Sequence, residues 1–454
     1  MKKIKLLLTM AVIVFTTMIC CSMSAFALTE GDWEFQLSNN EVTITKYVGA
    51  GGEAIIPETI YGCPVTKIEK AAFYLTNVGS IKINAKITEI PYNFAWQAKS
   101  LTEVTIPEGV TTIDSNAFYQ CLSLETVYLP STLETIGSSA FSECKVLKNI
   151  KLPENLKTVK NWAFQYTGLE EVTIPASVKE VGKSMFGDCK SLKSVIFEEG
   201  CETVSGGMFD GCKALEKVEL ANTITTIGSS AFAGCSSLKE LVLPTGLKVI
   251  NDIAFYGCSS LKELIIPYGV EEIWTLTFDN NTIKSIFIPD TVTKIERRII
   301  DSSRVPNAIV YCGDGSAVAE HCQKNNISYL TDSSVNSGIH VLYNGERISF
   351  HSYSQNPEIL EGRTLVPLRS IFEAMGADVE WDGATSTAIA KRGNVEVKIT
   401  IGASEIYKNG KAIPVDVPAM LLNSRTMVPA RVIAEAFGAN VDWNGNGRVV
   451  LITE

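Results

Sequence analysis

A phenylalanine recurs ten times between Phe73 and Phe278, and the spacing between successive copies is almost always 22 or 23 residues. It belongs to a longer phrase, which reads Ile-Gly-Ser-Ser-Ala-Phe-Ser-Glu-Cys at 136–144 and returns at 227–235. A second phrase, Leu-x-x-Val/Ile/Leu-x-Ile/Leu-Pro, keeps the same period. A fixed period in the twenties is typical of one supersecondary unit stacked on copies of itself. The pattern predicts a solenoid over two thirds of the chain, which points away from catalysis.

The first 27 residues have the composition of a targeting segment. Three lysines within the first five residues precede an apolar run that ends near Ile19, and Ala-Phe-Ala follows at 25–27. This order predicts a secretory signal peptide over residues 1–27. A lipoprotein anchor at Cys20 or Cys21 is the alternative, and the residues before these cysteines are a poor fit to it. No later segment is apolar enough to span a membrane, so we expect an extracellular protein, secreted or associated with the cell wall.

The chain is acidic, with a formal net charge of −10 that becomes −13 once the three lysines of the signal peptide are removed. Nucleic acids and anionic membranes are recognised through basic patches. The charge therefore argues against both as partners.

Ten cysteines remain after the predicted signal peptide, and six of them occupy one position of the repeat, three residues after the phenylalanine: Cys121, Cys144, Cys189, Cys212, Cys235 and Cys258. Equivalent positions on adjacent coils lie ~4.8 Å apart. Their parallel side chains would hold the Cβ atoms further apart than the ~3.8 Å that a disulfide prefers. We therefore predict a ladder of buried, reduced thiols. Cys312 and Cys322 flank a short helical stretch, and whether they pair is left open.

One repeat can be divided into parts, taking the copy that starts at Leu238. Leu241 and Leu243 alternate inward as in a strand, and a proline ends that strand. A second short strand is expected at 246–250, followed by a compact turn that carries Ala254 and Phe255. Truncated or altered copies at the ends predict caps: strands around 41–45 and 55–57 at the N-terminus, and a strand at 308–311 with a helix at 316–325 at the C-terminus.

The Ala-Phe-x-x-Cys and Ile-Pro phrases resemble those of the BspA-like leucine-rich repeat family, over about residues 33–330. The resemblance implies a mainly β, right-handed leucine-rich-repeat solenoid with caps, which we place at 28–330. It also implies a surface or secreted protein involved in adhesion. Repeat scaffolds carry many ligands, so the family alone names none.

The residue between the last two inward positions of the first strand should point outward. Along the stack these residues are Thr105, Tyr128, Lys151, Thr173, Ile196, Glu219, Val242, Ile265 and Phe287, and five of the nine are apolar or aromatic. Strand propensity alone is one explanation. The other is a ligand-binding strand face, for which we select Tyr128, Thr173, Ile196, Val242, Ile265 and Phe287. The last four of these form the more continuous apolar patch.

Residues 331–338 are small and polar and predict a linker. Beyond them a different duplication appears, since the motif at 363–381 returns at 425–443. Each copy predicts a strand, a helix that opens near a proline, a glycine at the end of the helix and a strand ending in tryptophan. Asn344-Gly345 and Asn409-Gly410 are typical of hairpin turns.

This pair of motifs resembles the copper amine oxidase N-terminal-like domain over residues 339–454. The resemblance implies a small α+β module without copper or a quinone, because those groups belong to a separate catalytic domain. It also implies retention at the bacterial cell surface. Two arginine pairs, Arg363 with Arg369 and Arg425 with Arg431, could contact an anionic wall polymer. The alternative is that they brace helix against strand through Glu373 and Glu435.

Candidates for chemistry are few. The three histidines, His321, His340 and His351, are scattered, and no nucleophile elbow, Walker loop or zinc signature occurs. We predict no catalytic residue, no metal and no cofactor. The sequence thus favours an exported, non-catalytic binding or adhesion protein. Its ligand would be a protein or glycan on the solenoid, with cell-wall polymer as a further partner of the C-terminal module. The alternatives are an envelope spacer without a specific ligand and an accessory subunit of a secreted enzyme.

Overall fold

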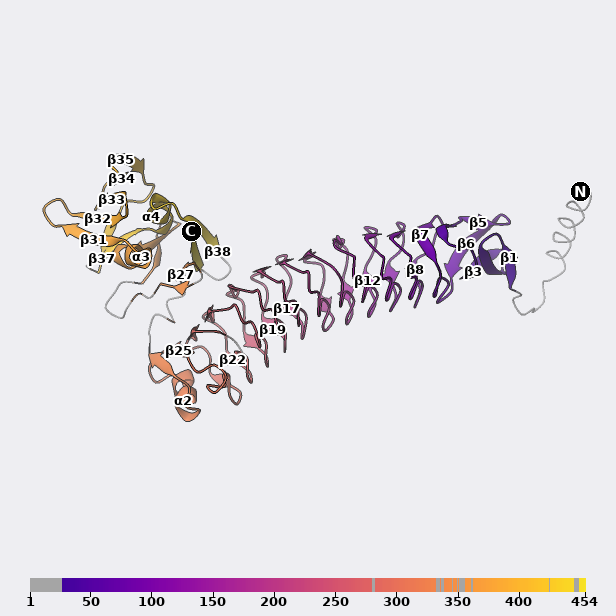
Figure 1. Ribbon diagram of the computed structural model, residues 1–454, viewed down its shortest axis with the longest axis horizontal. Helices are drawn as coiled ribbons and strands as arrows, with labels where there is room; N and C mark the ends of the chain where they lie inside the picture. Colours follow the sequence, from indigo (N-terminus) through magenta and orange to yellow (C-terminus); the bar gives the residue numbers. More distant parts are fainter. Residues whose placement is uncertain are drawn as a thin grey trace, which may run out of the picture.

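The computed structural model describes residues 27–279, 282–331, 335, 339–344, 346–348, 350, 356–360, 362–423, 425–444 and 449–454. The predicted signal peptide lies outside these ranges apart from Ala27, and so does most of the predicted linker. Figure 1 shows a long row of stacked coils followed by a smaller C-terminal module beside the last of them. Within the described ranges, we find no helix with the length and apolar composition that a membrane crossing needs.

Most solenoid coils contribute a first strand and a second, shorter strand. The first strands are β4 (Gly52–Ile56), β7 (Val78–Ile83), β9 (Glu103–Thr105), β11 (Thr126–Tyr128), β14 (Glu171–Ile174), β16 (Ser194–Phe197), β18 (Lys217–Glu219), β21 (Glu263–Ile265), β23 (Ser285–Phe287), β25 (Ile309–Cys312) and β26 (Tyr329–Thr331). The second strands are β8 (Glu89–Ile90), β10 (Thr112–Ile113), β12 (Thr135–Ile136), β13 (Thr158–Val159), β15 (Glu180–Val181), β17 (Thr203–Val204), β19 (Thr226–Ile227), β20 (Val249–Ile250), β22 (Glu272–Ile273) and β24 (Lys294–Ile295). Within each sheet of both series, the strands of neighbouring coils pair in parallel. The mainly β solenoid predicted from the repeat is confirmed.

Both ends of the solenoid are capped. At the N-terminus β1 (Leu28–Glu30), β2 (Trp33–Ser38), β3 (Glu41–Tyr47), β6 (Cys63–Ile68) and β5 (Thr59–Ile60) form one sheet. At the far end helix α2 (Ala317–Lys324) begins after Ser316, whose hydroxyl accepts the N–H of Ala319 at 3.2 Å. The predicted strands at 41–45 and 308–311 and the predicted helix are present within two residues of their expected bounds. The strand expected at 55–57 is β4, which begins three residues earlier and belongs to the first-strand ladder instead of the capping sheet.

The first-strand ladder is broken at two coils. It divides into the sheets β4-β7-β9-β11, β14-β16-β18 and β21-β23-β25-β26, and the described residues 149–151 and 240–242 form no strand. The strand expected around Leu241 and Leu243 was therefore wrong. Both leucines are nonetheless buried, so the side chains keep their inward alternation where the strand hydrogen bonds are not formed.

The recurring phenylalanines form a continuous column inside the stack. All ten are fully buried. From Phe118 to Phe278 each ring stacks on the next, with centroids 5.2 to 6.2 Å apart and planes within 19° of parallel. Stacked aromatic pairs add about 0.5–1.5 kcal/mol each beyond the area they bury. The column therefore supplies a core that does not depend on the broken strand ladder.

One coil departs from the phenylalanine pattern. Its spacing is irregular because Phe94 and Ala95 stand in exchanged order relative to Ala117 and Phe118. The backbone hydrogen bonds confirm the register, since the N–H of Ala95 donates to Ala117 as the N–H of Phe118 donates to Ala140. The ring of Phe94 meets its two neighbours edge-on, at 61° and 77°. The exchange thus replaces stacking by edge contacts without leaving a gap.

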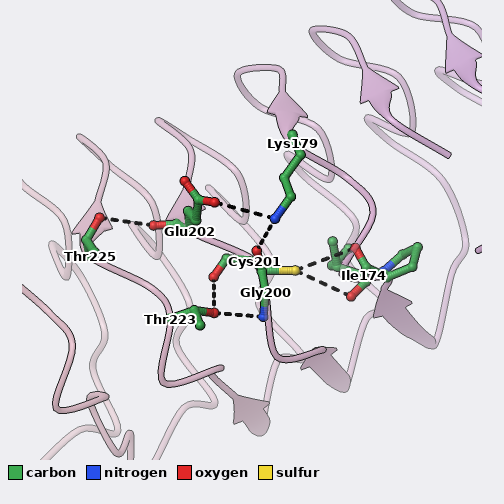
Figure 2. A network of polar contacts seen from close by, with 8 residues as sticks. Ile174, Lys179, Gly200, Cys201, Glu202, Thr223 and Thr225 are labelled. Atoms are coloured by element: carbon green, nitrogen blue, oxygen red, sulfur yellow. Dashed lines mark hydrogen bonds and ion pairs between the residues drawn. The ribbon is translucent and has the colours of Figure 1, made fainter. Parts of the chain in front are cut away.

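Polar contacts also join neighbouring coils, as Figure 2 shows around Gly200. The N–H of Gly200 donates to the Thr223 hydroxyl at 2.9 Å, and that hydroxyl donates to the carbonyl of Cys201 at 2.6 Å. Thr132 bridges Gly109 and Val110 in the same way. These threonines satisfy backbone groups in the turn between the two strands, where the ladder cannot.

The cysteine column lies beside the phenylalanine column. Each of the six thiols donates to a carbonyl 25 or 26 residues earlier, for example Cys144 to Phe118 at 3.2 Å and Cys212 to Phe186 at 3.1 Å. All ten described cysteines are free thiols, Cys312 and Cys322 included. Burial raises the pKa of Cys121 and Cys258 to about 12.

We expect the six column thiols to resist alkylation in the folded protein. Because only the thiolate reacts and burial disfavours it, maleimide at pH 8 should label the half-buried Cys63 and spare the column until denaturant is added. Mass spectrometry of the labelled protein measures the count under both conditions. Rapid native labelling of Cys144 or Cys212 would contradict the packing described above.

In its described residues, the C-terminal module consists of three sheets and two helices. The sheets are β28 (Glu346–Arg347), β27 (His340–Tyr343), β39 (Val449–Thr453) and β38 (Asn440–Asn444); then β29 (Glu358–Leu360), β30 (Arg363–Pro367), β37 (Arg425–Pro429) and β36 (Met420–Leu422); and then β31 (Asp378–Asp382), β32 (Thr387–Arg392), β33 (Val395–Thr400), β34 (Glu405–Lys408) and β35 (Lys411–Pro414). The helices are α3 (Leu368–Ala374) and α4 (Ala430–Ala436).

The duplicated motif forms the centre of this module. Strands β30 and β37 pair antiparallel, and Pro367 and Pro429 precede the two helices. Gly376 and Gly438 follow them with φ of 74° and 90°, a left-handed conformation that favours glycine. The rings of Phe372 and Phe437 meet edge-on 5.3 Å apart. The strand–helix–strand prediction is confirmed, and so is the two-residue hairpin at Asn409-Gly410.

Candidate ligand-binding face

The outward residues of the first strands form one column along the solenoid. Of the six selected from the sequence, Tyr128, Thr173 and Ile196 are exposed, Tyr128 to 54% and Ile196 to 37%. The remaining outward residues of these coils, Thr105, Lys151 and Glu219, are exposed as well. This stretch is therefore open to a ligand, with polar and apolar side chains interspersed.

The other three selected residues are covered. Val242 is half-buried, and Ile265 and Phe287 keep only 9% and 3% of their surface. They form one apolar cluster with Val335, Leu342 and Val449, with Tyr311 and Leu451 packed against it. The expectation of a continuous exposed patch over these coils was wrong, because the C-terminal module occupies it. We call Val242, Ile265, Phe287 and Tyr311 the covered patch.

One face of the sheet β28-β27-β39 makes this contact. Leu342 is the direct register partner of Arg347 on β28 and of Leu451 on β39, and His340 is the partner of Val449. Register partners, and residues two apart on a strand, project from the same face of a sheet. These five side chains therefore lie on one face, while Val341 on the opposite face belongs to the core of the module.

Arg347 joins the module to the solenoid by two contacts. Its guanidinium carbon lies 4.2 Å from the centre of the Phe287 ring, a cation–π contact. Its backbone N–H donates to the Glu263 carboxylate on β21. Phe287 in turn stacks on Tyr311 with ring centroids 4.6 Å apart. A cation–π contact that is shielded from water is worth about 2 kcal/mol, so Arg347 is a principal anchor.

His340 is buried beside this anchor. Its Nδ1 accepts a hydrogen bond from Nε of Arg347 at 3.3 Å, and its side chain is 3% exposed. Burial, and to a smaller extent the nearby charge of Arg347, lower the pKa of His340 to about 3. The imidazole is therefore neutral in the docked arrangement at physiological pH.

A small pocket lies at the contact between the two parts. Its cavity volume is about 20 Å³, and it is partly open to solvent between Val242 and Ile265 of the solenoid and Leu342 and Val449 of the module. Glu240 and Glu263 stand on its solenoid side. It adjoins the break in the strand ladder at 240–242, where β21 is the edge of its sheet. The covered patch and the pocket together form a surface that binds apolar side chains of the module, next to the carboxylates of Glu240 and Glu263.

Sequence reasoning did not select Arg347, His340 or Glu263. A weak signal was present, because Val242, Ile265 and Phe287 are three successive apolar residues, whereas no two successive outward residues in the earlier coils are apolar. That run is what a covered surface requires, and it was interpreted as a ligand patch instead.

The arginine pairs of the module do not make the bracing contacts between helix and strand that were one of the two expectations. Arg369 and Arg431 pair with Glu373 and Glu435 one turn along their own helices, at 3.9 Å, so they do not brace helix against strand. Arg363 pairs with Asp416 at 2.5 Å. Arg369 and Arg431 remain more than 60% exposed, and contact with wall polymer stays a prediction.

The described residues include His321 and His340 but not His351. No cluster of three or more histidine, cysteine, aspartate or glutamate side chains that could hold a metal occurs there. The neighbouring carboxylates Glu271 and Glu272 form ion pairs with Lys248 and Lys294 on adjacent coils, at 3.2 and 3.0 Å. These two glutamates therefore form ion pairs between neighbouring coils.

Comparison with known families divides the chain in the same way as the structure. Residues 66–193 and 179–305 match the BspA type leucine rich repeat region, in six copies, and these matches together span more than half of the chain. Residues 342–452 match the copper amine oxidase N-terminal domain. A search of curated proteins found no match.

Several solved structures are similar to the solenoid. A leucine rich repeat protein of T. pallidum is 28% identical and covers 47% of this chain and 91% of its own, with a TM-score of 0.36. A leucine rich cell surface protein of Faecalibacterium prausnitzii is 24% identical over 69% of this chain and 97% of its own, with a TM-score of 0.36. The pneumococcal vaccine antigen PcpA is 20% identical over 69% of this chain and 100% of its own, with a TM-score of 0.37.

Proposed function

The chain belongs to the BspA type leucine rich repeat family, and on that premise we propose that it is an exported, non-catalytic binding protein of the cell surface. The solenoid would present the strand face of its open coils to a protein or glycan ligand. The leucine-rich repeat fold is typical of binding or adhesion, because stacked coils hold side chains in a fixed, extended array.

One observation carries this proposal most directly: the exposed column that contains Tyr128, Thr173 and Ile196. Tyr128 and Ile196 are exposed to solvent on strands whose backbones are fixed by parallel pairing. The strand of Tyr128 pairs with one neighbour, and the strand of Ile196 pairs with two. Aromatic and aliphatic residues held in this way offer contact area at low entropic cost. We place the ligand here, on coils that the module leaves open.

The proposal keeps the division of the chain predicted from the sequence: a signal peptide at 1–27, the solenoid at 28–330, a linker at 331–338 and the module at 339–454. The module would retain the protein at the envelope through wall polymer. Its match to the copper amine oxidase N-terminal domain and its exposed Arg369 and Arg431 support this role. No cofactor or metal is part of the proposal.

The test uses the full mature chain and the double substitution Tyr128→Glu with Ile196→Glu. We expect capture on immobilised extracellular matrix proteins or glycans to fall at least about tenfold, since two exposed apolar contacts are replaced by charges. Sedimentation with cell-wall sacculi should be unchanged, because that role is assigned to the module. Surface plasmon resonance and a pelleting assay provide the two measurements.

The matched control is Tyr268→Ala, which changes an exposed tyrosine (56%) outside the outward column. It should bind as the unmodified chain does. Equal capture by the double variant, with an unchanged circular dichroism spectrum, would instead favour a spacer without a specific ligand on this face. Failure to pellet with sacculi would contradict wall retention alone.

A further inference from the structure

The covered patch has the composition of a recognition site although it lies inside the chain. It combines two stacked aromatic rings, Phe287 and Tyr311, with the aliphatic Ile265 and with the carboxylate of Glu263. Buried aromatic anchors next to a charged group are typical of the centres of protein interfaces. In the coils towards the N-terminus the same outward column carries Thr105, Lys151 and Glu219, which do not repeat this combination.

What occupies the patch shows which chemistry it accepts. The occupant is a β-sheet face that places Leu342 next to Val449 on the apolar part and the guanidinium of its register partner Arg347 over Phe287. The backbone N–H of Arg347 reaches Glu263. The site therefore takes a β-structured polypeptide with an aliphatic side chain and an arginine on one face. Glu240 and Glu263 beside the pocket favour such a basic segment.

The contact that the occupant makes is small. The buried apolar cluster has five residues at its centre, which resembles the reversible contacts between domains. The pocket between Ile265 and Leu342 leaves this contact partly open to solvent.

We propose that the covered patch is a polypeptide-binding site which the C-terminal module occupies as an internal ligand, and that an external β-structured polypeptide with an arginine next to an aliphatic residue displaces it. This inference rests on the proposed binding function and adds a second site with its own ligand class. Because the module is tethered to the solenoid, its effective concentration is in the millimolar range. A competing ligand must therefore bind the patch more tightly than the module does.

The test uses the full chain and a variant that opens the contact without touching the patch. Leu342→Glu removes the aliphatic contact and places a carboxylate near Glu240 and Glu263. Leu342 is packed in the cluster with the covered patch and not in the core of the module, so the module should still fold. Leu421→Glu is the matched control, since that leucine is 59% exposed on β36.

The probe is a fluorescent synthetic peptide with the sequence of residues 339–348. If the module covers the patch more than about 99% of the time, the opened variant should bind this peptide about 100-fold more tightly than the control does. A peptide with glutamate in place of Arg347 should not bind. Adding Phe287→Glu to the opened variant should abolish binding. Fluorescence anisotropy gives the affinities, and small-angle scattering reports opening.

Three results would overturn the inference. The first is an opened variant, larger by scattering, that binds the peptide no better than Leu421→Glu does. The second is a chain that stays closed in both Leu342→Glu and Arg347→Glu, which would make the contact a permanent part of the fold. The third is a dimer by light scattering, which would make a second copy of the module the partner. None of these results bears on Tyr128 and Ile196, so the proposed function is tested independently of this inference.

Discussion

Replacing Phe164 by alanine is expected to lower the free energy of unfolding of the solenoid by about 3–5 kcal/mol. The ring lies at the middle of the stack, fully buried, with centroids 5.4 Å from both Phe141 and Phe186 and planes within 8° of parallel. Its removal leaves a cavity and two rings that each lose a partner, which costs about 0.5–1.5 kcal/mol per pair beyond the lost burial.

The effect should also appear in the shape of the unfolding transition. Each coil of a solenoid contacts only its neighbours, so a weakened central coil divides the stack into two parts that can unfold separately. Urea unfolding followed by circular dichroism should show a lower midpoint and a broader transition. Tyr166→Ala, which removes a 40% exposed ring from the same coil, is the control and should change stability by about 0.5 kcal/mol or less. Equal midpoints for the two variants would show that the column is not the main source of stability.

Acidification from pH 7.5 to 4.5 should weaken docking of the module by about 2–3 kcal/mol. The pKa of His340 is lowered to about 3 by burial in the docked arrangement, against 6.5 for a free imidazole. Between these values the undocked state binds a proton that the docked state excludes. Stability of the docked arrangement is therefore complete above pH 6.5 and decreases as the pH falls towards 3.

A substitution separates the proton uptake of His340 from that of the other groups at this contact, where Arg347 keeps its charge throughout this pH range. Small-angle scattering should show a larger radius of gyration at pH 4.5. The variant His340→Gln keeps an acceptor for Arg347 but has no proton to gain, so its scattering should not change. The variant retains His321 on α2. If the pH effect persists in it, the effect arises from a group other than His340.

The solenoid could be predicted because each coil repeats the same short sequence pattern and therefore the same local structure. The inward Leu241 and Leu243, the column of phenylalanines and the donating thiols all follow from the spacing of one phrase. The missing strand at 240–242 could not be foreseen, since its sequence matches the copies that do form one. The exchange of Phe94 and Ala95 was visible as irregular spacing, but only the backbone register shows that both residues changed columns.

The covering of Ile265 and Phe287 was beyond sequence reasoning for a different reason. It depends on contacts between residues 263–311 and 340–451, and no periodic pattern connects segments that far apart. An outward strand residue was taken as solvent-facing because nothing local to it says otherwise. Arg347 and His340 lacked any motif, and their roles arise only when β27 and β28 are laid against the last coils.

The regular spacing of contacts makes the length of the solenoid adjustable. The contacts described between coils join residues about one period apart. They are hydrogen bonds from thiols to carbonyls, stacked phenylalanine rings and hydrogen bonds between threonines and turns. Removal of one whole period from the central coils would bring equivalent partners together and shorten the molecule by ~4.8 Å. Among the described residues, the apolar contact of the docked module involves coils towards the end of the solenoid. Related chains could therefore gain or lose coils upstream, and so change how far the open face extends from the module, while the docking contact stays the same.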